Sequence, residues 1–225
     1  MHGLRWRAFA GLTQLEVAVA LLLFLPAGTV RFWQAWVYWG VFTVSVVLIS
    51  VYFLKRDPGL VERRLRAGPA AERERSQKVI QALAGILWCL LFVVPGLEHR
   101  FRPAPLPPAL VLAGDGLAAA GFAIVFLVFR ENSYAAGSIE VEPGQQVVST
   151  GPYALVRHPM YAGAALMLLA TPPALGSLWG LACAIPLCGL IAVRAVEEER
   201  TLGRSLPGYE AYRRKVRHRL IPGIW

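Results

Sequence analysis

Two polar stretches in the second half of the chain contain side chains that could do chemistry. The first ends in the string GPYALVRHPMY, which places Tyr153, His158 and Tyr161 at the start of an apolar run. If Pro159 opens a helix there, the free N–H groups and the positive end of the helix dipole suit a bound carboxylate. Considered alone, the stretch is explained better by interfacial anchoring, with Arg157 and His158 at the membrane surface and the tyrosines in an aromatic belt.

The second stretch begins at Arg194 and contains three consecutive glutamates, Glu197 to Glu199. On a helix, Arg194 and Glu198 are four residues apart and share one face. Three successive side chains fan around about 200° of a helix, so one or two glutamates can face a pocket and the others are expected to be solvated. Considered alone, this stretch predicts a charged exit helix with a surface ion pair that contributes about 0.3–0.5 kcal/mol.

The elements that would position these residues are hydrophobic helices. Of the 225 residues, 56% are hydrophobic and 16% are charged, whereas an ordinary soluble domain has about 25% charged residues. Period-2 alternation is absent, so the strands of a membrane barrel are a poor fit. The four longest apolar runs approach the ~20 residues with which a helix crosses a ~30 Å hydrocarbon core, and two are shorter. We therefore predict an all-α integral membrane protein with about six transmembrane helices, over Leu12–Val30, Phe32–Leu54, Val79–Leu97, Ala109–Phe129, Tyr161–Leu175 and Leu178–Val193.

The basic residues predict how these helices are oriented. With six crossings, 20 of the 23 Lys and Arg residues fall on one side, and only Arg31, Arg100 and Arg102 fall on the other. Because positive residues stay in the cytoplasm, both termini and both polar stretches are expected there, at the inner membrane if the source is bacterial. Topology and anionic lipid also account for the net charge of +9, so a nucleic-acid partner is not expected.

The pattern divides the chain into three parts. Residues 1–54 are a predicted pair of N-terminal transmembrane helices, residues 55–78 a cytoplasmic segment, and residues 79–225 the core that carries both polar stretches. Within the cytoplasmic segment, Asp57-Pro58 predicts the start of a helix. The leucines and arginines that follow favour a helix lying at the level of the lipid headgroups.

The last two apolar runs, separated by Gly176-Ser177, predict a tight helical hairpin. Its arms leave and return at the same face of the membrane, so Arg157–Tyr161 and Arg194–Glu198 should meet at its base. An Arg-His-Tyr group and an Arg-Glu group would then converge in a pocket open to water on one side and to lipid on the other. This convergence favours a functional site over the two structural explanations above.

Four strings, GPYALVRHPMY, EEERTL, LPGYEAY and VRHRLIPGIW, resemble the isoprenylcysteine carboxyl methyltransferase family of integral membrane enzymes. The related phospholipid amine methyltransferases share the RHPxY…EE core. The resemblance covers residues 131–225, and the segment KRDPGLVERRLRAG is similar to bacterial members. It implies methyl transfer from S-adenosylmethionine to a lipophilic or lipidated acceptor at the membrane interface, with carboxylate O-methylation as the leading reaction.

The resemblance also implies roles for individual residues. Glu198 matches the family's acidic cofactor contact, and Arg194 matches an arginine implicated with the substrate, so these two are the candidate catalytic residues. Because LPGY is one residue tighter than the FGxxY of better-known members, the register of the three glutamates could slip by one. The residues implied to bind the cofactor are Gln145, Gln146, Val147, Val148, Tyr153, His158, Pro159, Met160, Tyr161 and Glu198.

These residue types suit methyl transfer. Transfer from a sulfonium is an in-line displacement, so catalysis consists largely of aligning and desolvating the nucleophile. A carboxylate acceptor is already ionised and needs only an arginine to orient it. An amine acceptor would have to be neutral, which gives His158 or Glu198 a role as base. The presence of Arg194 favours the anionic acceptor.

Two other functions stay open at this point. Membrane sterol and steroid reductases have a similar C-terminal arrangement and use NADPH, although paired glutamates suit a phosphate-bearing cofactor poorly. A small transporter or scaffold is the other, with Glu16 and Asp115 as acidic residues inside the spans. Asp115 is expected to cap or bond a neighbouring helix. Three cysteines without CxxC spacing predict neither a disulfide framework nor a metal site. The acceptor and the oligomeric state stay open.

Overall fold

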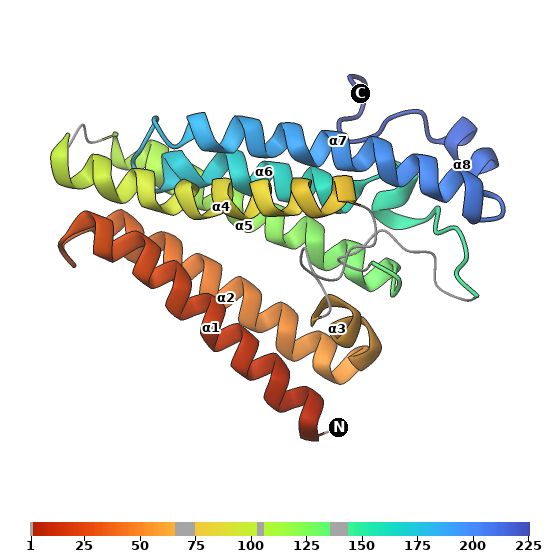
Figure 1. Cartoon of the computed structure of the whole chain (residues 1–225), viewed down its shortest axis with the longest axis horizontal. Coiled ribbons are helices and arrows are strands. Elements are labelled where there is room, and N and C mark those ends of the chain that lie inside the picture. Colours follow the sequence, from red (N-terminus) through yellow and green to blue (C-terminus); the bar gives the residue numbers. More distant parts are fainter. Residues whose placement is uncertain (1, 66–74, 103–105, 136–143) are drawn as a thin grey trace.

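The computed structural model describes residues 2–65, 75–102, 106–135 and 144–225, and every regular element in these ranges is helical. The all-α prediction is therefore confirmed for the described part of the chain. The elements, labelled in Figure 1, are α1 (His2–Ala27), α2 (Trp33–Arg56), α3 (Pro58–Leu65), α4 (Arg75–Phe101), α5 (Pro108–Glu131), the 3₁₀ turn η2 (Gly151–Ala154), α6 (Pro159–Ala174), α7 (Leu181–Ser205) and α8 (Tyr209–Lys215).

Four of these helices, α1, α2, α4 and α5, are long and apolar enough to cross a membrane. The chain is therefore a membrane protein. α6 has 16 residues, and the 25 residues of α7 end in a charged segment, so neither is among the four. The prediction of six crossings, like the predicted orientation, stays a prediction.

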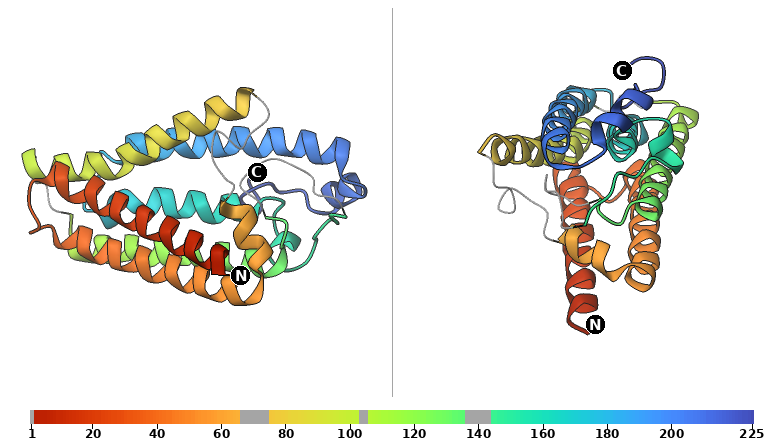
Figure 2. Two further views of the ribbon diagram at one scale, coloured as in Figure 1. Left: turned by 60° about the horizontal axis from the view of Figure 1, so that its bottom comes forward. Right: turned by 90° about the vertical axis from the view of Figure 1, so that its right-hand side faces the viewer.

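The long helices run back and forth between two ends of the molecule. α6 packs against α5 and α7, and α7 packs against α4, while α1 and α2 pack on α4 and α5. Figure 1 and the left view of Figure 2 show the connections α1–α2 and α6–α7, the end of α4 and the start of α5 at one end of the molecule. Helices α3 and α8 and the two termini lie toward the other end. The structure thus contains the predicted α6–α7 hairpin, and both polar stretches lie at its open end.

Helices α5 and α6 touch backbone to backbone. A Cβ atom added to Gly114 would lie 2.6 Å from the Ala174 nitrogen, and one added to Gly121 would lie 2.7 Å from the Gly163 carbonyl oxygen. Such distances exclude any side chain, and small residues are what allow membrane helices to approach this closely. The contact holds α6 firmly against α5, the helix that precedes the first polar stretch. It therefore fixes the position of the start of α6, where Tyr153 to Tyr161 lie.

Helix α3 begins where the sequence predicts, because the Asp57 carboxylate accepts a hydrogen bond of 2.9 Å from the Leu60 N–H. Leu60 is only 1% exposed and packs with Phe53, Val128 and Phe129. α3 is therefore docked on the bundle through one buried leucine. The rest of the predicted cytoplasmic segment includes residues 66–74, which lie outside the described part of the chain.

Asp115 differs from the other buried acidic residues in the described part of the chain. Asp115 on α5 is 5% exposed, and neither of its carboxylate oxygens has a hydrogen-bond partner among the described residues. The expectation that Asp115 caps or bonds a neighbouring helix is therefore wrong within the described ranges. Glu16 on α1 differs, because it accepts a hydrogen bond of 2.6 Å from the Thr43 hydroxyl on α2.

Candidate active site

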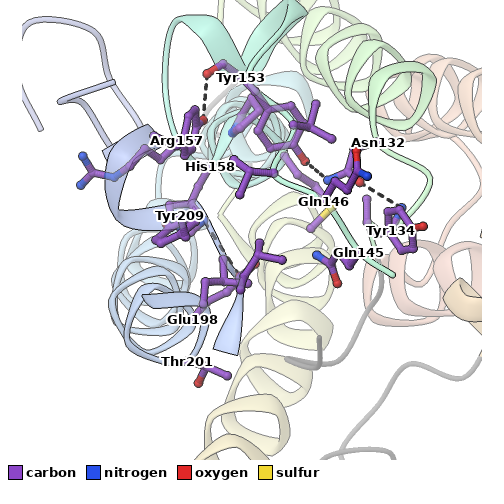
Figure 3. A pocket seen from close by; sticks show the side chains of 18 of the residues that line it. Asn132, Tyr134, Gln145, Gln146, Tyr153, Arg157, His158, Glu198, Thr201 and Tyr209 are labelled. Carbon is purple, nitrogen blue, oxygen red and sulfur yellow. Dashed lines mark hydrogen bonds and ion pairs between the residues drawn. The ribbon is translucent and has the colours of Figure 1, made fainter. Parts of the chain in front are cut away.

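A cavity lies at the open end of the α6–α7 hairpin, and its walls come from four parts of the chain. The end of α5 and the residues after it, the segment from Gln145 to Tyr161, the second half of α7, and α8 all contribute (Figure 3). The lining residues are Asn132, Tyr134, Ala135, Gln145, Gln146, Val147, Val148, Tyr153, Arg157, His158, Pro159, Met160, Tyr161, Glu198, Thr201, Leu202, Leu206, Tyr209 and Tyr212.

All ten residues that the resemblance implies as cofactor-binding are in this set, whereas Arg194 is not. His158 and Glu198, which are 40 positions apart in the sequence, line the same cavity. The local cause is that Pro159 opens α6, as predicted, which leaves His158 at the helix start with 5% exposure. α7 runs antiparallel beside α6 and brings Glu198 to the same level.

The Tyr161 hydroxyl connects α6 to α7. It donates a hydrogen bond of 2.6 Å to Glu198 and accepts one of 3.1 Å from Arg194 Nε. Gln77 on α4 extends the network, since its side-chain oxygen accepts a bond of 2.7 Å from Arg194 Nη1 and its amide nitrogen donates to Glu197. Arg194 and Glu198 are thus connected through the Tyr161 hydroxyl. The alternative explanation, a charged helix leaving the membrane, predicted a direct ion pair between them at the surface.

Glu199 is the most extensively hydrogen-bonded of the three glutamates. Its side chain is 4% exposed and accepts bonds from Arg157 Nε at 2.6 Å and Arg219 Nε at 3.0 Å, with His158 Nε2 at 3.2 Å. Burial acts to raise the pKa of Glu199, but the bonds from His158, Arg157 and Arg219 outweigh it and hold the pKa at about 2. The expectation that the glutamates outside the pocket are solvated is wrong for Glu199.

Arg157 ties the cavity wall to the C-terminal segment. Its Nη1 donates to the carbonyls of Val216 at 2.9 Å and Arg217 at 2.8 Å, and its backbone N–H donates to the His218 carbonyl at 2.9 Å. Its side chain is 6% exposed and that of His158 is 4% exposed. Interfacial anchoring is therefore the wrong explanation for Arg157 and His158, because both are enclosed by protein.

Three tyrosines form much of the remaining wall. The Tyr153 hydroxyl accepts a bond of 2.9 Å from Asn132, and the Tyr212 hydroxyl donates one of 2.8 Å to the Tyr153 carbonyl. Burial, only partly offset by the Asn132 bond, raises the pKa of Tyr153 to about 12. Burial, with Glu199 and Glu198 nearby, also raises the pKa of Tyr209. These phenols are neutral near pH 7, so they serve as hydrogen-bonding and stacking surfaces there.

The cavity offers a donor set for an organic cation with an aromatic part. Glu198 supplies a carboxylate, Gln145 and Gln146 supply amides, and the tyrosines supply ring faces. The Tyr209 hydroxyl is buried in this wall and has no hydrogen-bond partner among the described residues, so a bound molecule can satisfy it. In the same ranges no three His, Cys, Asp or Glu side chains cluster as metal ligands. The residues present therefore fit S-adenosylmethionine.

The sequence contains one signal that Glu199 is buried. Ala195, Glu199, Leu202 and Leu206 recur at helical spacing, which puts Glu199 on the buried stripe of α7. Tyr209 and Tyr212 likewise share one face of α8. Asn132, Arg157 and Gln77 lack such a periodic signal, because their roles depend on contacts between distant elements.

Residues 109–205 match the family model described as phospholipid methyltransferase. The match extends from the start of α5 to the end of α7 and so includes most of the cavity wall. No curated protein matches the chain significantly. The matched family is one of methyltransferases, which together with the four apolar helices supports a membrane enzyme that transfers methyl groups.

Proposed function

We propose that this protein is an S-adenosylmethionine-dependent methyltransferase that methylates the carboxylate of a lipophilic acceptor, of the isoprenylcysteine type, at the membrane interface. The observation that carries the proposal is the common cavity of His158, Tyr161 and Glu198 at the end of the α6–α7 hairpin. The family-model match over the same helices supports the transfer of a methyl group.

Glu198 is the residue that would bind the positive part of the cofactor. Its side chain is 27% exposed and the Tyr161 hydroxyl fixes one carboxylate oxygen, and the other oxygen would face the cation. When bound, S-adenosylmethionine supplies a methyl group on a sulfonium, whose positive charge disappears on transfer. Gln145, Gln146 and the unpartnered Tyr209 hydroxyl would hold the polar parts of the cofactor.

Arg194 is the residue that would orient the acceptor. It lies beyond the Tyr161 hydroxyl, outside the set that lines the cavity, so the acceptor approaches from the side opposite the cofactor. An ionised carboxylate needs alignment and loss of water but no base. His158 then has a positioning role, because its Nε2 is held by Glu199 and its ring stacks on Tyr161 with centroids 5.5 Å apart.

The second candidate is N-methylation of a phospholipid amine, which the matched family's description favours. An amine must lose a proton before or during transfer. His158 Nδ1 lies 4.0 Å from the Glu198 carboxylate, and in this reaction the pair would accept that proton.

Titration calorimetry of S-adenosylhomocysteine into the detergent-purified protein tests the cofactor site. We expect Glu198→Ala to weaken binding at least about tenfold, as expected when a hydrogen bond to a charged group is lost. We expect His158→Ala to weaken binding as well, because it removes the ring that stacks on Tyr161 and positions it. Glu210→Ala is the matched control, because Glu210 pairs with Arg213 on the surface and lies outside the cavity. Unchanged binding in both site variants would remove the assignment, and stabilisation by NADPH in place of the methyl-donor product would indicate a reductase.

Incubating membranes with methyl-labelled cofactor separates the two candidate reactions. A methyl ester releases labelled methanol on treatment with base, whereas a methylated amine retains its label. We expect base-labile label in the lipid fraction. Base-stable label would overturn the carboxylate acceptor and select the amine.

A further inference from the structure

A groove lies between α2 and α5, away from the cavity described above. None of the residues that line the groove lines the cavity. Leu48 and Tyr52 are exposed, so the groove is open to the lipid around the bundle. Its volume of about 760 Å³ is within the ~300–1,000 Å³ of ligand sites in general. The lining residues are Ser45, Leu48, Ile49, Val51, Tyr52, Lys55 and Arg56 on α2, and Ala119, Phe122, Ala123 and Phe126 on α5.

The groove has the length of a single leaflet of the bilayer. From Ser45 to Arg56 it follows α2 for about three turns, or about 16 Å at ~1.5 Å per residue. Half of a ~30 Å hydrocarbon core is about 15 Å. Apart from Ser45 and the Tyr52 hydroxyl, the lining along this length is apolar up to Lys55. The groove therefore suits an acyl chain that runs from the membrane surface to the middle of the bilayer.

Two cations lie at the end of the groove. Lys55 and Arg56 are in the last turn of α2, and both are exposed. Neither side chain has a hydrogen bond or an ion pair with another described residue. Tyr52 lies one turn earlier, and tyrosine rings at the end of a membrane helix typically lie at the level of the headgroups. An apolar groove that ends in two cations fits an amphiphile with an anionic headgroup.

The charges favour an anionic headgroup over a zwitterionic one. Lys and Arg side chains bind phosphate oxygens, and no acidic side chain among the described lining residues is present to pair with the amine of a zwitterionic headgroup. Both cations lie at the end of the bundle that the sequence predicts to be cytoplasmic. The cytoplasmic leaflet is the anionic one, and basic pockets between membrane helices on that side bind its headgroups.

The groove and the active-site cavity are separate but rest on the same apolar cluster. Ile49 and Phe126, which line the groove, pack on the cluster that contains Phe129. Tyr153 and Met160, which line the cavity, pack on this cluster too. A molecule in the groove therefore supports the cavity wall from behind without entering the cavity.

We propose that this groove is a binding site for one anionic phospholipid, whose acyl chain lies between α2 and α5 and whose phosphate is bound by Lys55 and Arg56. The site does not depend on the methyl-transfer reaction, because the groove and the cavity share no residue. The lipid in it is a bound component of the bundle and not the acceptor.

Native mass spectrometry of the detergent-purified, full-length protein tests the site with two probes, dioleoyl phosphatidylglycerol and dioleoyl phosphatidylcholine. The two lipids have the same chains and differ in headgroup charge. We expect one phosphatidylglycerol to bind at least about tenfold more tightly than phosphatidylcholine, as hydrogen bonds to a charged group predict. In the double variant Lys55→Gln/Arg56→Gln the two affinities should lie within about twofold of each other.

The matched control removes the same charge at the same end of the bundle. Arg5 and Arg7 on α1 are exposed, and neither lines the groove. Arg5→Gln/Arg7→Gln should therefore keep the preference for phosphatidylglycerol within about twofold of that of the unaltered protein. An equal loss of preference in the two double variants would indicate a general attraction of anionic lipid to basic residues and would overturn the site.

A second variant tests the groove without a change of charge. Ala119 lines the groove on α5, and Ala119→Phe should weaken phosphatidylglycerol binding several-fold by filling it. The neighbouring Ala120 is exposed and outside the lining, so Ala120→Phe should bind the lipid as the unaltered protein does. Equal binding in these two variants would overturn the placement of the acyl chain.

The lipid site and the proposed function fail in different ways. Equal binding of the two lipids by the unaltered protein, or a full preference in Lys55→Gln/Arg56→Gln, overturns the lipid site while S-adenosylhomocysteine still binds. Displacement of phosphatidylglycerol by N-acetyl-S-farnesylcysteine would make the groove part of the acceptor site and also overturn the proposal. A protein that prefers phosphatidylglycerol but does not bind S-adenosylhomocysteine overturns the proposed function alone.

Discussion

Glu198 and Glu199 are neighbours in the sequence, but their surroundings differ sharply. Glu199 is 4% exposed and is bonded by two arginines and a histidine, whereas Glu198 is 27% exposed and shares one phenol with Arg194. A buried carboxylate whose hydrogen bonds are all made stabilises the surrounding part of the cavity wall. A carboxylate with free capacity beside a cavity can bind a ligand. Two adjacent side chains on one helix therefore have different surroundings, and in the proposed function only Glu198 binds the cofactor.

The largest expected effect is at Arg157, which bonds to Glu199, the structural carboxylate of this comparison. Arg157→Ala removes a buried partner of Glu199 and the bonds to Val216 and Arg217. We expect it to lower the free energy of unfolding by about 3–5 kcal/mol, as loss of one member of a buried ion pair does. Thermal and denaturant unfolding in detergent measure this.

Arg213→Ala is the control for Arg157→Ala, because Arg213 is 48% exposed in its pair with Glu210. Its effect should be below about 1 kcal/mol. If Arg157→Ala and Arg213→Ala lowered the stability equally, Glu199 would not have the structural role that distinguishes it from Glu198.

A second test uses the pH dependence of stability. The pKa of Glu199 falls from 4.5 in an unperturbed carboxyl to about 2 in the folded protein. Its stabilising contribution is therefore complete above the unfolded value and is lost as the pH falls from about 4.5 to about 2. The total is about 3 kcal/mol at 1.36 kcal/mol per unit. In Glu199→Gln, unfolding temperatures should be lower at neutral pH and should fall less steeply with acid; an equally steep fall would assign the acid sensitivity to other groups.

The smallest expected effect is at Tyr161, on the binding side. Tyr161→Phe removes the phenol that joins Arg194 to Glu198 and keeps the ring that stacks on His158. We expect affinity for S-adenosylhomocysteine to fall about fivefold, since one hydrogen bond contributes about 1 kcal/mol, with little change in the unfolding temperature. A large loss of stability with unchanged affinity would place Tyr161 on the structural side instead.

Local patterns made the framework of this molecule predictable. Apolar runs and well-placed prolines predict the α6–α7 hairpin, the start of α6 at Pro159 and the start of α3 at Pro58, because these depend on residues close together in the sequence. Convergence of the two polar stretches followed from topology alone. The lining residues from Gln145 to Val148 came from the resemblance and not from any local signal.

Pairings between distant segments were the part that could not be predicted. Glu199 is satisfied by Arg219, from the segment after α8, and Arg194 by Gln77 on α4. No periodicity in one helix specifies which charge of another segment will reach it. The contact of Arg64 on α3 with Met160 could not be predicted for the same reason, since it exists only once α3 has docked.

The backbone contact between α5 and α6 at Gly114 and Gly121 limits how the hydrocarbon tail of a lipid can reach the cavity. Where backbone meets backbone, a prenyl or acyl chain has no room to wedge the two helices apart. The tail of the proposed lipophilic acceptor therefore cannot reach the cavity between α5 and α6 and has to enter beside another face of α6.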